Sequence, residues 1–217
     1  MARRLQREGR DTRRLIVDRA AEQFALWGYS GASISGIAAA VGVSKPTLYH
    51  HFTDKEEIYV EIVTSVLADM ARRVAAAVTG IAAPAARLRV FMRVHAQYLE
   101  ENEHAYISAQ LGFRGLRSAN GRDRALELRD RYEALLAEIL EDGQRSGELR
   151  MPDVRTATLL VLSALNWMAR WYRASGEVSA VEFADRYCDT LLQGLLPRGA
   201  EADTHTLSPA RGPRRTH

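Results

Sequence analysis

The sequence contains a single cysteine, Cys188, among 217 residues. One thiol excludes an internal disulfide framework and any zinc module built from several cysteines. No uncharged apolar run reaches the roughly 18 residues that a membrane-spanning helix requires. Residues 1–14 contain six arginines and lack the apolar stretch of a secretory signal. These absences make a cytoplasmic protein the default expectation.

Lysine is nearly as scarce: Lys45 and Lys55 are the only lysines among the 30 basic residues, and the other 28 are arginines. The net charge is +3, yet residues 1–14 hold six arginines against two acidic residues. A basic terminal segment is common in proteins that bind nucleic acid, although a solvated tail would have the same composition. We expect residues 1–9 to form a basic disordered arm, and its contact with DNA stays open.

Proline is infrequent too, at six residues, and no segment alternates apolar and polar residues over the length of a strand. Apolar residues recur at spacings of three and four, which predicts an all-α fold. A capping box at residues 53–56 begins a helix that extends to about residue 78. Residues 198–217 show no periodicity and predict a disordered tail. The other expected helices cover residues 12–27, 34–41, 45–51, 84–102, 104–116, 122–145, 153–175 and 180–196.

Residues 33–52 predict two short helices joined by a tight turn. Ser33 and Ser44 stand where N-cap residues are expected, and Gly42 suits the left-handed residue that ends the first helix. This is the layout of a helix-turn-helix, whose second helix enters the major groove of DNA. The expected small core consists of Ile37, Ala38, Val41, Val43, Leu48 and Phe52, and the expected outer face of Lys45, Thr47, Tyr49 and His50.

The same region resembles the TetR family of transcriptional regulators across about residues 10–70. The similarity rests on the Gly28-Tyr29 turn, on Ile37-Ala38 and Gly42-Val43-Ser44, and on Thr47-Leu48-Tyr49-His50-His51-Phe52 followed by Lys55. The resemblance implies a three-helix DNA-binding domain over residues 10–70 and a helical ligand-sensing and dimerisation domain over residues 71–197. The expected DNA-binding residues are Ser33, Ser35, Ser44, Lys45, Thr47, Tyr49, His50 and Lys55.

Two residues depart from the family pattern. Gly36 stands where the family often has a charged residue, which removes one expected phosphate contact. Pro46 replaces a common glycine and stiffens the beginning of the second short helix.

The last predicted helix, residues 180–196, has a wide apolar face. A palindromic operator requires a two-fold dimer, so this face predicts the dimer interface. Packing within one subunit is the alternative. The expected interface residues are Ala184, Cys188, Leu191 and Leu195.

The helix predicted within residues 156–176 is apolar nearly all round and should be buried on several sides. Its polar residues occupy one arc, bordered by two tryptophans, and such a surface could bind an anionic, partly apolar ligand. Alternatively, the arginines reach solvent or pair with Glu138 or Glu141. The expected ligand-binding residues are Ser163, Asn166, Trp167, Arg170, Trp171 and Arg173, with Phe91, Tyr98, Tyr106, Leu111 and Phe113 as apolar lining.

Asn166-Trp167, Arg170-Trp171-Tyr172 and Ser175-Gly176 also resemble a TetR branch that responds to CoA thioesters. This resemblance implies a repressor of fatty-acid, steroid or aromatic-acid catabolism that leaves a palindromic operator when an acyl-CoA binds. A multidrug-type repressor that senses a hydrophobic or cationic compound is the alternative, and it would call for acidic residues near the ligand.

An enzyme is disfavoured, because the sequence contains no glycine-rich phosphate loop, no HExxH motif and no nucleophile elbow. We expect no cofactor and no metal site. A DNA binder without sequence preference would require a more basic chain and no large apolar domain.

Overall fold

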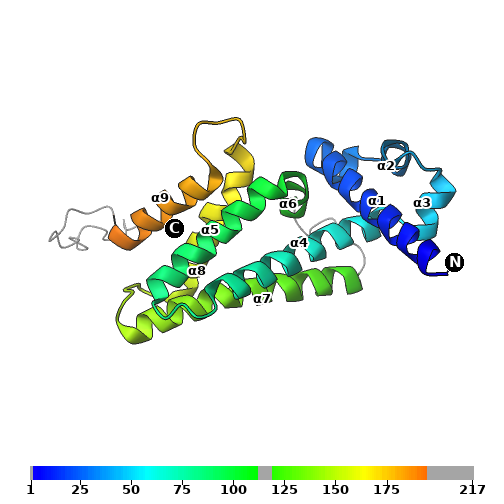
Figure 1. The fold of residues 1–217 in the computed structure, drawn as a ribbon. Helices are drawn as coiled ribbons and strands as arrows, with labels where there is room; N and C mark the ends of the chain where they lie inside the picture. Colours follow the sequence, from blue (N-terminus) through cyan, green and yellow to red (C-terminus); the bar gives the residue numbers. More distant parts are fainter. Residues whose placement is uncertain (1, 112–118, 195–217) are drawn as a thin grey trace, which may run out of the picture.

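The computed structural model describes residues 2–111 and 119–194, and within these ranges the chain forms nine α-helices. The expected all-α fold is confirmed. Helices α1 to α3 gather at one end of the molecule, and α4 runs from them into the remainder of the chain (Figure 1). The helices are α1 (Ala2–Gly31), α2 (Ile34–Val41), α3 (Lys45–His51), α4 (Lys55–Val78), α5 (Pro84–Glu101), α6 (Glu103–Gln110), α7 (Ala119–Ser146), α8 (Val154–Trp171) and α9 (Ala180–Gln193).

Helix α1 begins at Ala2, ten residues before the position expected from the sequence. Residues 2–9, for which we expected a disordered arm, therefore continue this helix. Gly28 interrupts α1 with a φ of 72°, a left-handed conformation that glycine adopts without steric cost. The sequence placed the helix end at this position. The expected disordered tail lies outside the described residues.

Both short helices begin at their predicted N-caps. Ser33 Oγ accepts a hydrogen bond from the Gly36 N–H at 3.0 Å, and Ser44 Oγ accepts one from the Thr47 N–H at 3.2 Å. Gly42 closes α2 with a φ of 78°. The small core between the helices is also confirmed: Ile37, Ala38, Leu48 and Phe52 are buried, and Val41 and Val43 are partly buried against them.

The N-terminus of α4 differs from the prediction by one residue. Its N-cap is Asp54, whose carboxylate accepts from the Glu57 N–H at 2.8 Å. Glu57 in turn accepts from the Thr53 N–H and hydroxyl at 2.7 and 2.9 Å. Asp54 thus caps the helix, and Glu57 reaches back past this N-cap to Thr53, so the arrangement resembles a capping box in which the returning bond is displaced by one residue.

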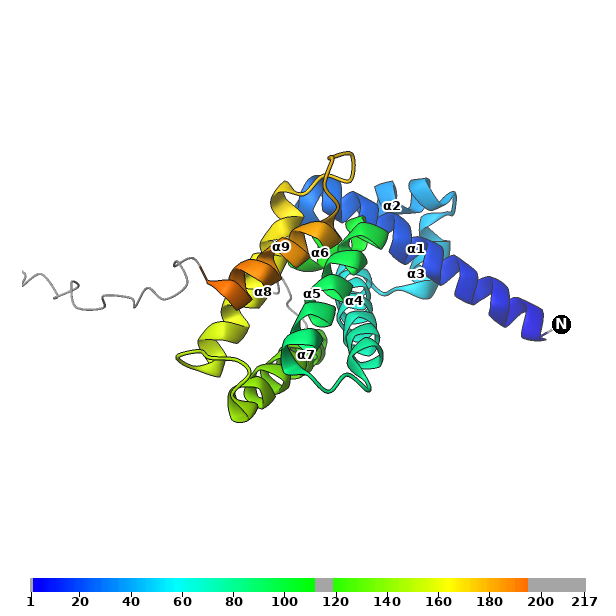
Figure 2. The same cartoon turned by 60° about the vertical axis from the view of Figure 1, so that its left-hand side comes forward.

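Helix α5 lies at the centre of the C-terminal helices, with α9 on one side and α4 on the other (Figure 2). Helix α8 ends at Trp171, about one turn earlier than expected, and α6 ends at Gln110. In the part of the chain that the structure describes, no helix combines the length and apolar character needed to cross a membrane.

Helix α6 joins the two ends of the molecule. The buried Ser108 hydroxyl donates to the Ala21 carbonyl of α1 at 2.7 Å, and the Ser108 carbonyl accepts from the Tyr59 hydroxyl of α4 at 3.2 Å. A displacement of α6 would therefore act directly on both helices that support α2 and α3.

Candidate nucleic-acid interface and ligand cavity

Helix α3 exposes the side chains that the sequence assigned to DNA. Lys45, Thr47, Tyr49 and His50 are exposed, whereas Leu48 is buried beneath them. Tyr49 is 52% exposed, an unusual state for an aromatic side chain without a partner molecule. The expected DNA-binding residues at the N-termini of α2 and α3, Ser33, Ser35 and Ser44, are exposed as well.

Lys55 has a different place from the one expected. Its ammonium group donates to the carbonyls of Tyr29 and Ala32 at 2.8 and 2.9 Å and lies 4.4 Å from the centre of the Tyr29 ring. The carbonyl groups at the end of α1 lack helical partners, and the lysine satisfies two of them. We therefore assign Lys55 to the attachment of α1 to α4 and leave it out of the DNA-facing set.

Arg13 is an internal connection that the sequence did not reveal. Its guanidinium donates to the His51 carbonyl and to the Glu61 carboxylate, and it lies 4.0 Å from the centre of the Phe52 ring. One side chain thus joins α1, the C-terminus of α3 and α4. Sequence alone counted Arg13 among the basic residues of the N-terminal segment, because the distant partners are brought near only by the fold.

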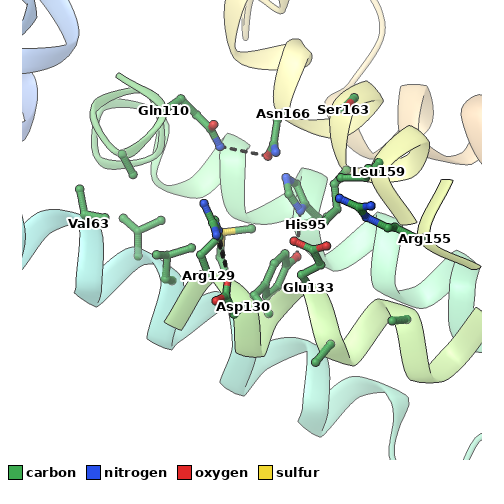
Figure 3. Close-up of a pocket in the computed structure, with 18 residues that line it drawn as sticks. Val63, His95, Gln110, Arg129, Asp130, Glu133, Arg155, Leu159, Ser163 and Asn166 are labelled. Atoms are coloured by element: carbon green, nitrogen blue, oxygen red, sulfur yellow. Dashed lines mark hydrogen bonds and ion pairs between the residues drawn. The ribbon is translucent and has the colours of Figure 1, made fainter. Parts of the chain in front are cut away.

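A cavity of about 740 Å³ lies among α4, α5, α6, α7 and α8 (Figure 3). This volume is within the range of small-molecule binding sites. Its apolar wall is provided mainly by Val63, Val66, Leu67 and Met70 of α4. The polar and charged residues that line it are His95, Gln110, Arg129, Asp130, Tyr132, Glu133, Arg155, Ser163 and Asn166.

The structure divides the expected ligand-binding residues into two groups. Ser163 and Asn166 line the cavity, whereas Trp167, Arg170, Trp171 and Arg173 do not. Arg170 has the same rotational position on α8 as the lining residues but lies one turn beyond Asn166. Its guanidinium is exposed and stands 5.0 Å from the centre of the Trp167 ring.

Arg173 cannot extend the polar arc, because α8 ends at Trp171 and Arg173 follows the helix. The basic residues at the cavity are instead Arg155, in the first turn of α8, and Arg129 of α7. Arg155 could have been found from the spacing: residues 155, 159, 163 and 166 follow the helical period.

The expected apolar lining is mostly core. Phe91 and Tyr98 are buried but do not line the cavity, and Leu111 is exposed outside it. Tyr106 is fully buried and contacts two residues of the cavity wall, His95 and Asn166. Phe113 lies outside the described residues.

Helix α8 buries Val161, Leu165 and Met168, but part of its apolar surface is exposed. Leu160 and Trp167 are 54% and 60% exposed, and Trp171 is 37% exposed. These residues recur at spacings of seven and four, so they form one outward apolar face. The apolar content of α8 thus serves two faces, one on the cavity and one on the surface.

The predicted dimer face of α9 is turned inward. Ala184 and Cys188 are fully buried against the core of the same subunit, so they cannot form a dimer interface, and Leu191 is partly buried there. Ion pairs to α5 flank this buried face: Arg89 contacts Asp189 at 2.5 Å, and Arg93 contacts Asp185. Packing within one subunit, the alternative considered for this face, is the arrangement that the structure has. Leu195 lies outside the described residues.

His95 is another polar residue of the cavity that the sequence analysis did not identify. Its ring nitrogens lie 2.8 Å from the Tyr132 hydroxyl and 2.6 Å from the Tyr106 hydroxyl. Burial lowers the pKa of His95 to about 3, so the imidazole is neutral at physiological pH.

Sequence profiles of two known domains match the chain. The profile described as "Bacterial regulatory proteins, tetR family" matches residues 16–62, which contain α2 and α3. The profile described as "Tetracyclin repressor-like, C-terminal domain" matches residues 82–195 and so includes most of the cavity.

Similar proteins cover nearly the same span. HTH-type transcriptional repressor KstR2 of Rhodococcus jostii is 31% identical over 183 residues, which are 83% of this chain and 89% of that protein. Fatty acid metabolism regulator protein of Bacillus subtilis is 26% identical over 189 residues, which are 83% of this chain and 93% of that protein.

Solved structures with the same fold include PfmR from Thermus thermophilus, with a TM-score of 0.79 and 40% identity over 84% of this chain and 99% of that one. AibR, solved in complex with isovaleryl coenzyme A and operator DNA, has a TM-score of 0.77 and 25% identity over 83% of this chain and 98% of that one.

Proposed function

Since the chain belongs to the TetR family of DNA-binding transcriptional repressors, and is therefore no enzyme, we propose that its cavity receives an acyl-CoA-type thioester and that the loaded protein leaves a palindromic operator. The observation that carries the effector class is the composition of the α8 face at the cavity. Arg155 stands at one end of this face and Asn166 at the other, with Ser163 between them.

This face offers a cation for a phosphate group and uncharged polar groups for an acyl carbonyl, opposite the apolar wall of α4. Arg155 is exposed and has no ion-pair partner among the described residues, so it is available to an anion. The complex of AibR with isovaleryl coenzyme A supports the same class, because that protein shares the fold over most of its length.

The operator is read by the exposed side chains of α3, with the N-termini of α2 and α3 against phosphates. The supporting observation is the exposure of Lys45, Thr47, Tyr49 and His50 on a helix whose opposite side is packed. The basic residues of α1 before Thr12 add affinity without sequence preference.

We further propose that the outward apolar face of α8 forms the homodimer interface. Trp171 packs edge-on against Phe183 of α9, with ring centres 4.9 Å apart, so the face continues onto α9. Leu160 and Trp167 would be covered by the same residues of a second subunit related by a two-fold axis. This assignment replaces the inward face at Ala184 and Cys188.

Release follows if the effector displaces α6, because Ser108 of α6 is bonded to α1 and α4. Gln110, which lines the cavity, stands two residues after Ser108 on the same helix. Operator affinity then falls by as much as the effector prefers the released conformation.

The proposal is tested by the shift in melting temperature of the full-length protein across CoA thioesters, the corresponding free acids and cationic drugs. A ligand at 100 times its Kd stabilises the folded protein by about 2.7 kcal/mol, which thermal unfolding detects readily. We expect stabilisation by CoA thioesters and release of the operator at the same concentrations. Indifference to every thioester would reject the effector class.

A multidrug-type repressor is the second candidate, and the acidic residues of the cavity favour it. Asp130 and Glu133 line the α7 side, although Asp130 already pairs with Arg129 at 2.7 Å. Stabilisation and operator release by a cationic drug alone would select this candidate.

A further inference from the structure

A chain of hydrogen bonds crosses the wall of the cavity and ends at Asn166. The Tyr132 hydroxyl of α7 lies 2.8 Å from His95 Nδ1, and His95 Nε2 lies 2.6 Å from the Tyr106 hydroxyl. The Tyr106 hydroxyl donates to Asn166 Oδ1 at 3.2 Å. Gln110 Nε2 donates to the same oxygen at 3.0 Å (Figure 3). Four helices thus contribute to one network.

Asn166 Oδ1, the acceptor at the end of the network, fixes the direction of each hydrogen bond from Asn166 back to Tyr132. An amide oxygen only accepts, so Tyr106 uses its hydrogen on Asn166 and must itself accept from His95 Nε2–H. His95 Nδ1 then carries no hydrogen and accepts from the Tyr132 hydroxyl. The neutral state of the buried imidazole is consistent with one donating and one accepting nitrogen.

The oxygen and the nitrogen of the Asn166 side-chain amide therefore have different roles. Two donors occupy Oδ1, whereas Nδ2 has no partner among the described residues. Because Asn166 lines the cavity, a ligand that enters meets an amide N–H pair held in place by the network. A group with its orientation fixed before binding loses little conformational freedom on contact.

We infer that the Asn166 amide donates a hydrogen bond to a carbonyl oxygen of the effector, and that this contact makes Asn166 the residue that selects acylated over alkylated ligands. The inference rests on the proposed function and adds the group that is recognised. A cationic group would find no acceptor here, because both lone-pair positions of Oδ1 are already occupied. The acidic Glu133 lies on α7, away from Asn166 (Figure 3).

The experiment compares hexanoyl-CoA with S-hexyl-CoA, which has the same chain and phosphates but a methylene in place of the carbonyl. Dissociation constants for both compounds are measured by calorimetry on the full-length protein. For the wild type we expect hexanoyl-CoA to bind roughly 3- to 10-fold more tightly, the effect of one neutral hydrogen bond.

Asn166→Asp is the informative variant, because a carboxylate can still accept from Tyr106 and Gln110 but has no N–H to donate. We expect the ratio of the two dissociation constants to fall to about 1 or to invert. The repulsion between the added charge and the CoA phosphates is the same for both compounds and cancels in the ratio, whereas repulsion of the carbonyl oxygen acts on hexanoyl-CoA alone. Gln193→Glu, the same change at the exposed end of α9, is the matched control and should keep the wild-type ratio.

Asn166→Leu provides a second test if the aspartate variant folds poorly, since it also removes the donor. Equal binding of the two compounds by the wild type would overturn the inference and leave the CoA-thioester proposal standing. So would an unchanged ratio in either Asn166 variant. If neither compound binds the wild type, the proposed function fails and the inference fails with it.

Discussion

The DNA-binding end and the cavity are assembled in different ways. The exposed polar residues of α2 and α3 lie within residues 33–50, and two serine N-caps and one glycine set their positions. The cavity takes side chains from five helices, between Val63 and Asn166. Local interactions thus determine the first site, and tertiary packing determines the second. Substitutions should therefore separate operator binding from effector binding, and four predictions test how far.

The largest effect is expected from the outward face of α8. Leu160→Glu combined with Trp167→Glu places charges on the proposed interface and should give monomers whose operator affinity is about 100-fold lower, because both half-sites must be bound together. Sedimentation and operator titration measure the two effects. Leu26→Glu, which alters a 68% exposed leucine of α1, should remain dimeric. Double variants that stay dimeric and bind normally would place the interface elsewhere.

At the DNA-binding end, Tyr49→Ala should weaken operator binding by about 1–3 kcal/mol without lowering the melting temperature or effector affinity. Lys55→Met should instead lower the melting temperature and leave operator affinity unchanged, because it leaves the Tyr29 and Ala32 carbonyls without their donor. Thermal unfolding and fluorescence anisotropy with labelled operator distinguish them. A Lys55 variant of unchanged melting temperature but reduced affinity would restore Lys55 to the DNA-facing set.

In the cavity, His95 should make stability depend on pH. Its pKa is about 3 in the folded protein and 6.5 in the unfolded chain, so only the unfolded state takes up this proton as the pH falls below 6.5. Stability contributed by neutral His95 is therefore complete above pH 6.5 and decreases by about 2 kcal/mol by pH 5. Urea unfolding at several pH values measures the loss. The free energy of unfolding of His95→Gln should not show this decrease. If it depends on pH as steeply as that of the wild type, the assignment to His95 is contradicted.

The smallest of the four effects concerns the two arginines of α8. Arg155→Gln should weaken CoA-thioester binding by about 10-fold and leave operator binding intact, because one charged contact at an exposed position is lost. Arg170→Gln should change effector binding by less than about 2-fold, since this residue does not line the cavity. Calorimetry with both variants decides between them. A larger loss of effector affinity in Arg170→Gln than in Arg155→Gln would place the ligand at the C-terminal end of α8.

The sequence was sufficient to predict the bounds of α2 and α3, because N-caps, glycine conformation and apolar spacing act over a few residues. It failed for Lys55 and Arg13, whose partners are 23 to 48 residues away and become neighbours only in the folded chain. No local rule reports such contacts.

For α8 the sequence identified the helix face that lines the cavity, but it placed the cavity too far toward the C-terminus of the helix. Ser163 and Asn166 share the cavity face, as the helical period requires, but the cavity ends before Arg170. The helix ends at Trp171 without a glycine or proline, because the Tyr172 hydroxyl is held by Glu100 of α5 at 3.0 Å. The sequence around residue 172 contains no sign of this tertiary contact.

For α9, an apolar face does not reveal which molecule covers it. The charges beside that face did contain the answer. Asp185 and Asp189 are four residues apart, as are Arg89 and Arg93 of α5, and the two pairs match across the contact between the helices. Complementary charge spacing on two predicted helices would have indicated that they pack within one chain.

The burial of Cys188 supplies a reporter that requires no engineering. It is the sole thiol of the chain, lies fully buried between α9 and α5, and has its pKa raised chiefly by burial. Thiol reagents attack the exposed thiolate, so the closed molecule resists labelling. In excess reagent, the labelling rate then gives the rate at which α9 separates from α5. Adding an effector or an operator to that assay would measure how each ligand changes the lifetime of this helix pair.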